Sequence, residues 1–159
     1  MADADEATSV SRWDADMARA LALARGAGAA GDVPVGAVVL DGNGVLLGEG
    51  GNRREQDGDA TAHAEVLAIR AACARRGAWR LDDCTLVVTL EPCTMCAGAL
   101  VNARIRRLVF GAFDPKAGAI ASLWDVVRDP RLNHRVEVVG GIMADDCQRV
   151  LTDFFATRR

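Results

Sequence analysis

The segment Cys84-Thr-Leu-Val-Val-Thr-Leu-Glu-Pro-Cys-Thr-Met-Cys96 decides the fold, because it predicts a buried strand that runs directly into a helix. Residues 84–90 are apolar except for two threonines, which is typical of a central strand covered on both faces. Pro92 suits the first turn of a helix, where its missing N–H would have no partner in any case. We therefore predict a helix over residues 93–103 and place the strand in the middle of a sheet.

Further strands and helices are predicted on both sides of this segment. Asp41-Gly42-Asn43-Gly44 has the composition of a tight turn, so the apolar runs on either side of it form a predicted β-hairpin. The predicted strands outside the central one are 35–40, 45–49, 107–110 and, at a sheet edge, 135–139. The predicted helices are one from Ser11 to the glycines 26 and 28, then 62–76, 120–128 and 145–155, with a loop over 50–61. Strands that alternate with helices predict an α/β fold, a three-layer α/β/α sandwich around a mixed five-stranded sheet.

The composition places the chain among ordinary globular proteins. Its 159 residues suit one domain, so we predict a single domain over residues 1–159, with the acidic residues 1–8 frayed. No run reaches the roughly 18 consecutive apolar residues that a membrane span requires. The acidic start has neither the basic nor the apolar region of a signal peptide, which indicates the cytoplasm. Five cysteines, an odd number, argue against a disulfide framework.

The charge of the chain is unevenly distributed. A net charge of −3 disfavours a protein that coats nucleic acid through bulk charge. Of the 19 basic residues, however, only Lys116 is not an arginine, and the planar guanidinium suits phosphate contacts. Genomic composition bias explains the same arginine content equally well.

The residues that carry chemistry are His63, Cys93 and Cys96. The two cysteines are three positions apart at a helix start, so their sulfurs lie on one face, near unpaired N–H groups that favour the thiolate. Two thiolates and a neutral imidazole suit Zn²⁺ well and Mg²⁺ poorly. Four other candidate ligands are less suitable. Cys84 and Cys147 enter apolar elements and suit a buried core. Cys73 stands about 15 Å along the predicted helix from His63, and His134 sits in a polar loop.

Three protein ligands predict a catalytic rather than a structural zinc, because structural sites take four and catalytic sites keep one position for water. A zinc of this kind lowers the pKa of a bound water from about 15.7 to about 7. Glu65 follows the histidine ligand by two residues and is the candidate to carry protons near the metal. A first-turn glutamate that complements the helix dipole is the alternative explanation, and spacing alone does not exclude it.

The segments His63-Ala-Glu65 and Pro92-Cys-Thr-Met-Cys96 resemble the signature of zinc-dependent nucleobase deaminases, whose mechanism is well described. The resemblance extends over roughly residues 11–157, and its flanking segments are most similar to the bacterial tRNA adenosine deaminases. These flanking segments include Val33-Pro-Val-Gly-Ala-Val38, Gly50-Gly-Asn-Arg53, Arg107-Leu-Val-Phe-Gly-Ala112, Asn133-His-Arg-Val136 and Asp153-Phe-Phe155.

The resemblance implies a cytidine-deaminase-like fold and conversion of adenosine to inosine at the wobble position of a tRNA anticodon loop. It implies that His63, Cys93 and Cys96 bind one Zn²⁺ per subunit and that Glu65 carries the catalytic proton. It also implies a homodimer. The residues implied to bind the substrate are Asn52 at the base, Val33, Leu90 and Ala112 along the pocket, and Asp114 near the flanking nucleotides.

Some positions depart from the family pattern, and they concern RNA contacts rather than chemistry. Gly51 and Trp79 stand where Trp and Tyr are common, and no long Lys-rich tail is present. Phe113 stands where Arg is common; it either offers a stacking face for RNA or serves as a core residue after a strand.

Two alternatives stay open. A deaminase of a free base or nucleotide, such as guanine or cytosine, would use the same zinc chemistry. An inactive, zinc-stabilised RNA-binding subunit would be expected to lack the glutamate, and Glu65 is present.

Overall fold

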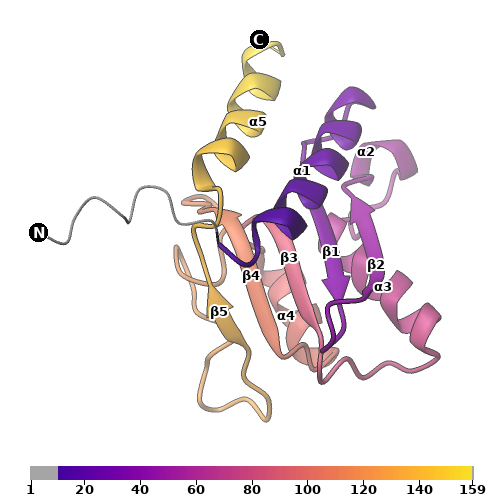
Figure 1. Ribbon diagram of the computed structural model, residues 1–159. Coiled ribbons are helices and arrows are strands. Elements are labelled where there is room, and N and C mark those ends of the chain that lie inside the picture. Colours follow the sequence, from indigo (N-terminus) through magenta and orange to yellow (C-terminus); the bar gives the residue numbers. More distant parts are fainter. Residues whose placement is uncertain (1–10, 159) are drawn as a thin grey trace, which may run out of the picture.

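The computed structural model describes residues 11–158, which form a five-stranded sheet with helices on both faces (Figure 1). The strands are β1 Gly36–Leu40, β2 Leu46–Gly51, β3 Thr85–Leu90, β4 Arg107–Ala112 and β5 Glu137–Val139. The helices are α1 Asp14–Ala29, α2 Arg54–Asp57, α3 Ala64–Arg76, α4 Thr94–Asn102 and α5 Ala144–Ala156.

The sheet has the order β2-β1-β3-β4-β5 and is mixed, as predicted. Strand β1 pairs antiparallel with both β2 and β3, while β4 lies parallel to β3 and β5 lies parallel to β4. The segment quoted at the outset therefore forms the central strand, and the last strand forms an edge. Because β3 and β4 are parallel, their carboxyl ends lie at the same edge of the sheet, and the segments that follow both strands start there.

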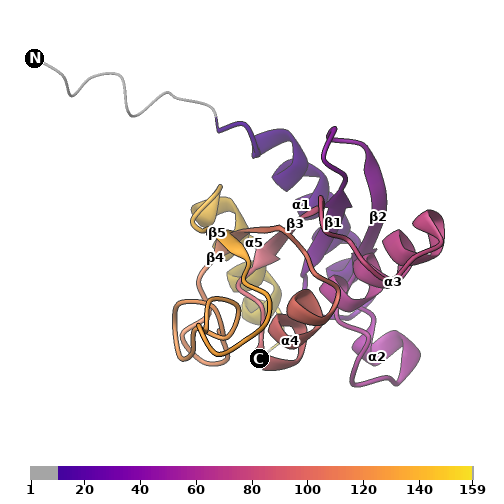
Figure 2. The same cartoon turned by 90° about the horizontal axis from the view of Figure 1, so that it is seen from below.

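Two layers of helices cover the sheet, so the predicted three-layer sandwich is confirmed. Helices α1 and α5 lie on one face, and α3 and α4 lie on the other (Figures 1 and 2). Alternate residues of the central strand serve the two faces: Leu86 and Val88 pack toward α3 and α4, whereas Val87 packs toward α1. All three side chains are fully buried, which explains why this strand lacks the alternation of an exposed sheet.

Helix α1 begins three residues after the predicted start at Ser11 and ends later than predicted. The Ser11 N–H donates to the Asp14 carboxylate at 3.1 Å, and the Ser11 hydroxyl accepts the N–H of Trp13 at 3.2 Å. The prediction that Gly26 and Gly28 end the helix is wrong, because the helix runs through both to Ala29. It ends where Gly31 takes a φ of +98°, a conformation that glycine adopts without strain.

Two local predictions on the loops are wrong for one shared reason. Residues 120–128 form turns instead of a helix, because the N–H groups of Ile120, Ala121 and Ser122 donate to the Glu91 carboxylate. Within the predicted loop 50–61, the short helix α2 forms because the buried Asp32 carboxylate accepts N–H groups of its first turn. In both places, a carboxylate distant in sequence binds the backbone and decides its conformation.

The prediction for residues 1–8 lies outside the described residues, and the assignment of one domain to residues 1–159 stays a prediction. Among residues 11–158, no helix is both long and apolar enough to cross a membrane.

Candidate metal centre and active site

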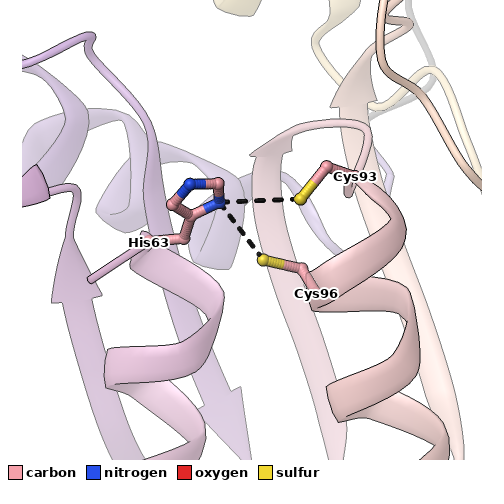
Figure 3. A group of neighbouring side chains, drawn as sticks. All are labelled: His63, Cys93 and Cys96. Carbon is pink, nitrogen blue, oxygen red and sulfur yellow. Dashed lines mark hydrogen bonds between the residues drawn. The ribbon is translucent and has the colours of Figure 1, made fainter. Parts of the chain in front are cut away.

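The candidate metal centre lies where two helices begin on the same face of the sheet (Figure 3). His63 is the N-cap residue of α3, and Cys93 is the N-cap residue of α4. Neither side chain caps its own helix; instead, the imidazole and the thiol point toward each other. Cys96 joins them from the first turn of α4. The positive ends of two helix dipoles therefore meet at the sulfurs, where they stabilise negative charge.

The imidazole nitrogen lies at the separation from each sulfur that a shared zinc ion requires, and all three donor atoms lie within 4.8 Å of one another. The Nδ1 atom of His63 lies 3.6 Å from the Cys93 sulfur and 3.5 Å from the Cys96 sulfur. Zinc bonds of about 2.05 Å to nitrogen and about 2.3 Å to sulfur, at a tetrahedral angle, separate these donors by about 3.5 Å. Within residues 11–158, this is the one group of three or more His, Cys, Asp or Glu side chains arranged to hold a metal ion. The donor set fits Zn²⁺.

The other candidate ligands bind elsewhere, as their sequence context suggests. The His134 Nε2 atom lies 2.7 Å from the backbone oxygen of Ile105, and the Cys73 thiol donates to the backbone oxygen of Trp79 at 3.6 Å. Cys84 and Cys147 are buried in the core. Each of these side chains has a structural environment of its own, so the metal group has three members.

The two thiols of the centre have different acidities in the absence of metal. A hydrogen bond from Cys96, assisted by one from His63, lowers the pKa of Cys93 to about 3 against the opposing effect of burial. The same sulfur–sulfur contact, together with burial, raises the pKa of Cys96 above the ordinary range for a thiol. The hydrogen bond to Cys93 also raises the pKa of the His63 imidazole. The group is thus ready to present one thiolate, and a cation would stabilise the second.

Glu65 stands in the first turn of α3, next to these donors. Its side chain is buried and contributes to the wall of the cavity in front of the metal group. Burial is the main cause that raises the pKa of its carboxyl group, and the neighbouring Cys93 thiolate adds to it. A buried carboxyl group beside a metal site is suited to accept a proton and to release it again.

A cavity of about 160 Å³ lies in front of the metal group. Asn52 forms part of its wall with both ends of its amide engaged: Nδ2 donates to the Val33 backbone oxygen at 3.1 Å, and Oδ1 accepts the Arg54 N–H at 3.1 Å. The cavity is lined by Val33, Val35, Asn52, Arg54, His63, Ala64, Glu65, Leu90, Glu91, Cys93, Asp114 and Ala117. Of the five substrate-binding residues predicted from the sequence, four are therefore brought together at one place.

Ala112 requires a correction, because it lies outside the cavity wall. It is the last residue of β4, and its backbone oxygen accepts the Glu91 N–H at 2.8 Å. This bond holds Ala112 in the sheet, and its methyl group is buried in the core beneath α1 and α5.

A larger groove of about 1000 Å³ adjoins the cavity and shares five of its lining residues. It extends along α5 and is bordered by Phe113, Lys116 and Phe155. Phe113 is 49% exposed, and its ring forms a T-shaped pair with the ring of Phe110, with 5.0 Å between the centroids. Phe113 therefore borders the groove and also contacts the core through Phe110.

Two residues that shape the cavity, Asp32 and Glu91, were not predicted from the sequence. Both side chains are almost fully buried, and both bind backbone N–H groups of the segments that flank the cavity. Burial alone would raise the pKa of Glu91, but the hydrogen bonds from Ser122 and Ala121 outweigh it and lower the pKa. The only sequence signal for Glu91 was its charge at the end of an apolar strand.

Comparison with known proteins agrees with this geometry. The profile of the MafB19-like deaminase family matches residues 11–159. The tRNA-specific adenosine deaminase of Haemophilus influenzae is 47% identical over 156 residues, which cover 98% of this chain and 90% of the relative.

Two solved structures are similar over most of the chain. One comes from a study of A-to-I editing by tRNA:A34 deaminases at the wobble position of transfer RNA. It is 44% identical with a TM-score of 0.81, and the match covers 85% of this chain and 97% of that one. The other, a guanine deaminase from Nitrosomonas europaea, is 27% identical with a TM-score of 0.79, over 92% of this chain and 86% of that one. The chain belongs to the MafB19-like deaminases and, among them, to the family of the tRNA-specific adenosine deaminases.

Proposed function

We propose that this protein hydrolyses the bond between C6 and the amino group of adenosine in tRNA, at the wobble position of the anticodon, and so produces inosine. One observation carries this proposal beyond a general deaminase activity. The small cavity in front of the metal group opens directly into a groove of about 1000 Å³, which is far more room than a free base needs. The tRNA-specific adenosine deaminase relatives support the same substrate.

Zn²⁺ is the proposed cofactor, and His63, Cys93 and Cys96 are its proposed ligands. The nitrogen–sulfur separations of 3.5 and 3.6 Å and the sulfur-rich donor set fit this ion. When bound, zinc supplies Lewis acidity that activates water for attack on the base.

Glu65 is the proposed proton carrier. Its buried carboxylate accepts a proton from the attacking water and delivers it to the purine ring, so that the tetrahedral carbon can form at C6. A second transfer gives the amino group the proton with which it leaves as ammonia, and the oxygen stays on C6 as the carbonyl of inosine. The low exposure of Glu65 supports this role, since bulk water does not compete for the proton there.

Asn52, Val33 and Leu90 are the proposed contacts of the adenine base. The two hydrogen bonds of the Asn52 amide fix its orientation, and each of its polar atoms keeps capacity for one more bond to the base edge. Val33 and Leu90 offer apolar surface to the ring faces. Asp114 lies where the cavity meets the groove, which suits contacts to the nucleotides beside the target.

An unpaired base suits this site better than a base in a duplex, because a stacked and paired base cannot reach a recessed metal group. An anticodon loop presents its bases already unpaired. The groove offers aromatic rings for stacking and the cations Arg54 and Lys116 for phosphates, which is the combination that single-stranded RNA requires.

The decisive experiment is to incubate the purified protein with total tRNA and to sequence the product, with free adenosine, guanine and cytosine as competing substrates. We expect A-to-I conversion at the wobble base and no turnover of the free compounds. The affinity of such an enzyme for RNA should also fall steeply between roughly 50 and 200 mM salt. Deamination of a free base, with unchanged tRNA, would replace this proposal by the guanine- or cytosine-type activity.

We also propose that the protein acts as a homodimer in the cytoplasm, where tRNA is used. The dimer is supported by the family resemblance and by the apolar side chains that one subunit leaves exposed, among them Leu123 and Trp124. Light scattering at the concentration of the activity assay should give twice the chain mass. A monomer that is fully active would contradict the dimer.

A further inference from the structure

Glu91 is a buried carboxylate that the proposed chemistry does not use. It stands between the end of β3 and the start of α4, with only 2% of its surface exposed. A carboxylate in such a place must be compensated by hydrogen bonds, because burial of an uncompensated charge is strongly unfavourable.

The compensation comes from one loop. The Asp114 N–H donates to Oε1 of Glu91 at 3.0 Å. The N–H groups of Ile120, Ala121 and Ser122 donate to Oε2 at 3.1, 2.8 and 3.0 Å, and the Ser122 hydroxyl donates to Oε1. Five donors from residues 114–122 thus converge on one side chain, and this carboxylate adds to the backbone bonds of the loop, in which the Gly118 N–H donates to the Asp114 oxygen at 2.9 Å and the Ala119 N–H donates to the Pro92 oxygen at 2.8 Å.

The loop is wrapped closely around the carboxylate. A Cβ atom added at Gly118 would lie 2.3 Å from the carboxyl carbon of Glu91 and 2.4 and 2.5 Å from its two oxygens. Only glycine allows this approach. The loop conformation and the carboxylate are therefore complementary in shape as well as in hydrogen bonding.

The same loop forms the wall on which the cavity and the groove meet. Asp114 and Ala117 line both. The Asp114 carboxylate in turn accepts the N–H groups of Lys116 and Ala117 at 3.0 and 3.2 Å, so its side chain follows any movement of the loop backbone. The bonds of Glu91 are made at both ends of this wall and thereby fix it relative to the metal group.

We propose that Glu91 is a positioning residue for the RNA: its carboxylate holds the loop 114–122 in the conformation that binds the nucleotides beside the target base. This inference rests on the proposed function, and it assigns to Glu91 an effect on substrate affinity rather than on metal binding or proton transfer.

Glu91→Gln tests the proposal, because the amide replaces one acceptor oxygen by an NH2 group that faces N–H donors. We expect KM for tRNA to rise about 10- to 100-fold, as for a misplaced positioning group, with kcat changed much less and the zinc content unaltered. Hydrogen exchange at the amides of residues 114 and 120–122 should become faster in this variant.

Two further variants reach the same loop without removing the carboxylate. Gly118→Ala inserts a methyl group against Glu91 and should raise KM in the same way, whereas Ser122→Ala removes one donor and should have a smaller effect of about 2- to 5-fold. Asp41→Asn is the matched control: its carboxylate also accepts backbone N–H groups, of Asn43 and Val45 at 2.8 and 2.9 Å, but in the turn at the far end of β1. This control should leave KM unchanged.

An unchanged KM in folded Glu91→Gln, or a loss of zinc or of kcat alone, would overturn the proposal. If Glu91→Gln does not fold, an unchanged KM in Gly118→Ala would overturn it equally. Hydrogen exchange separates this failure from failure of the proposed function. If exchange in the loop is faster in Glu91→Gln but the wild-type protein does not deaminate tRNA, the proposed substrate is refuted. If exchange in the loop is unchanged in Glu91→Gln, the role of Glu91 is refuted.

Discussion

The metal centre and the 113–136 connection between β4 and β5 lie side by side at the cavity, yet they are held in different ways. The metal donors stand at the starts of α3 and α4, two helices that rest on the fully buried centre of the sheet. Residues 113–136, all within the described part of the chain, contain no helix or strand, and one carboxylate organises their first third. The comparison teaches that the metal donors are placed by regular helices and a buried sheet, while the wall between the cavity and the groove is placed by the turns of one connection and by a single buried carboxylate.

The largest effect is expected where the framework supplies a ligand. Cys93→Ala should remove zinc and lower the activity by at least about 10⁴-fold, because both the nucleophile and its position depend on the ion. Elemental analysis and turnover on tRNA measure this. Cys73→Ala, a cysteine outside the metal group, is the control and should keep one zinc per chain. Full metal occupancy in Cys93→Ala would refute the ligand assignment.

The second largest effect is expected where a substitution removes proton transfer but leaves the metal ligands and the fold in place. Glu65→Gln should keep the fold and the zinc but lose about 10²–10⁴-fold in kcat, the usual contribution of general acid–base catalysis. Single-turnover kinetics on tRNA is the measurement, and the control is Glu49→Gln, which changes a half-exposed glutamate on β2 that pairs with Arg19. Near-normal turnover by the Glu65 variant would contradict its assigned role.

A smaller effect is expected in the connection, where binding rather than chemistry should change. Phe113→Ala removes a half-exposed ring that borders the groove, and loss of one base-stacking contact should raise KM for tRNA by about 5- to 100-fold. The zinc content should stay the same. Val45→Ala, an exposed residue in the turn between β1 and β2, serves as the control. If the two substitutions have equal effects, Phe113 only packs against Phe110.

The smallest effect is expected from Gly98→Ala, which can be compared with the same substitution at Gly118 in the other region. Gly98 lies in α4, where an added Cβ meets no atom within 4 Å, whereas at Gly118 it meets the Glu91 carboxyl group. Gly98→Ala should therefore stabilise the protein by about 0.5–1 kcal/mol through the higher helix propensity of alanine. Thermal unfolding should show a rise of about 1–4 °C in Tm. A lower Tm would mean that α4 does not accept the added methyl group, although no atom lies within 4 Å of its position.

The sequence predicted the framework well because its signals are local. Continuous apolar character identified β3, and the spacing of Cys93 and Cys96 at a helix start identified the metal group. The errors over residues 120–128 and 50–61 occurred where backbone groups bind distant side chains, whereas the end of α1 was placed too early because the helix runs through Gly26 and Gly28. Nothing near residues 120–128 indicates that their N–H groups meet Glu91, and nothing near Arg54 indicates that Asp32 supports a helix there. Ala112 was misplaced because its side-chain direction depends on how β4 ends against its neighbours.

The placement of His63 and Cys93 at two helix starts has a consequence for the choice of ligands. Zinc accepts imidazole as readily as thiolate, so a site with two or three histidines would suit the ion itself. Here the ion would add its two positive charges to the partial positive charges of α3 and α4. Two sulfur anions cancel the charge of the cation and leave a neutral cluster between the helix ends. An exchange of either cysteine for histidine would leave net positive charge at that point, and the electrostatics of the fold would disfavour it even though the coordination chemistry allows it.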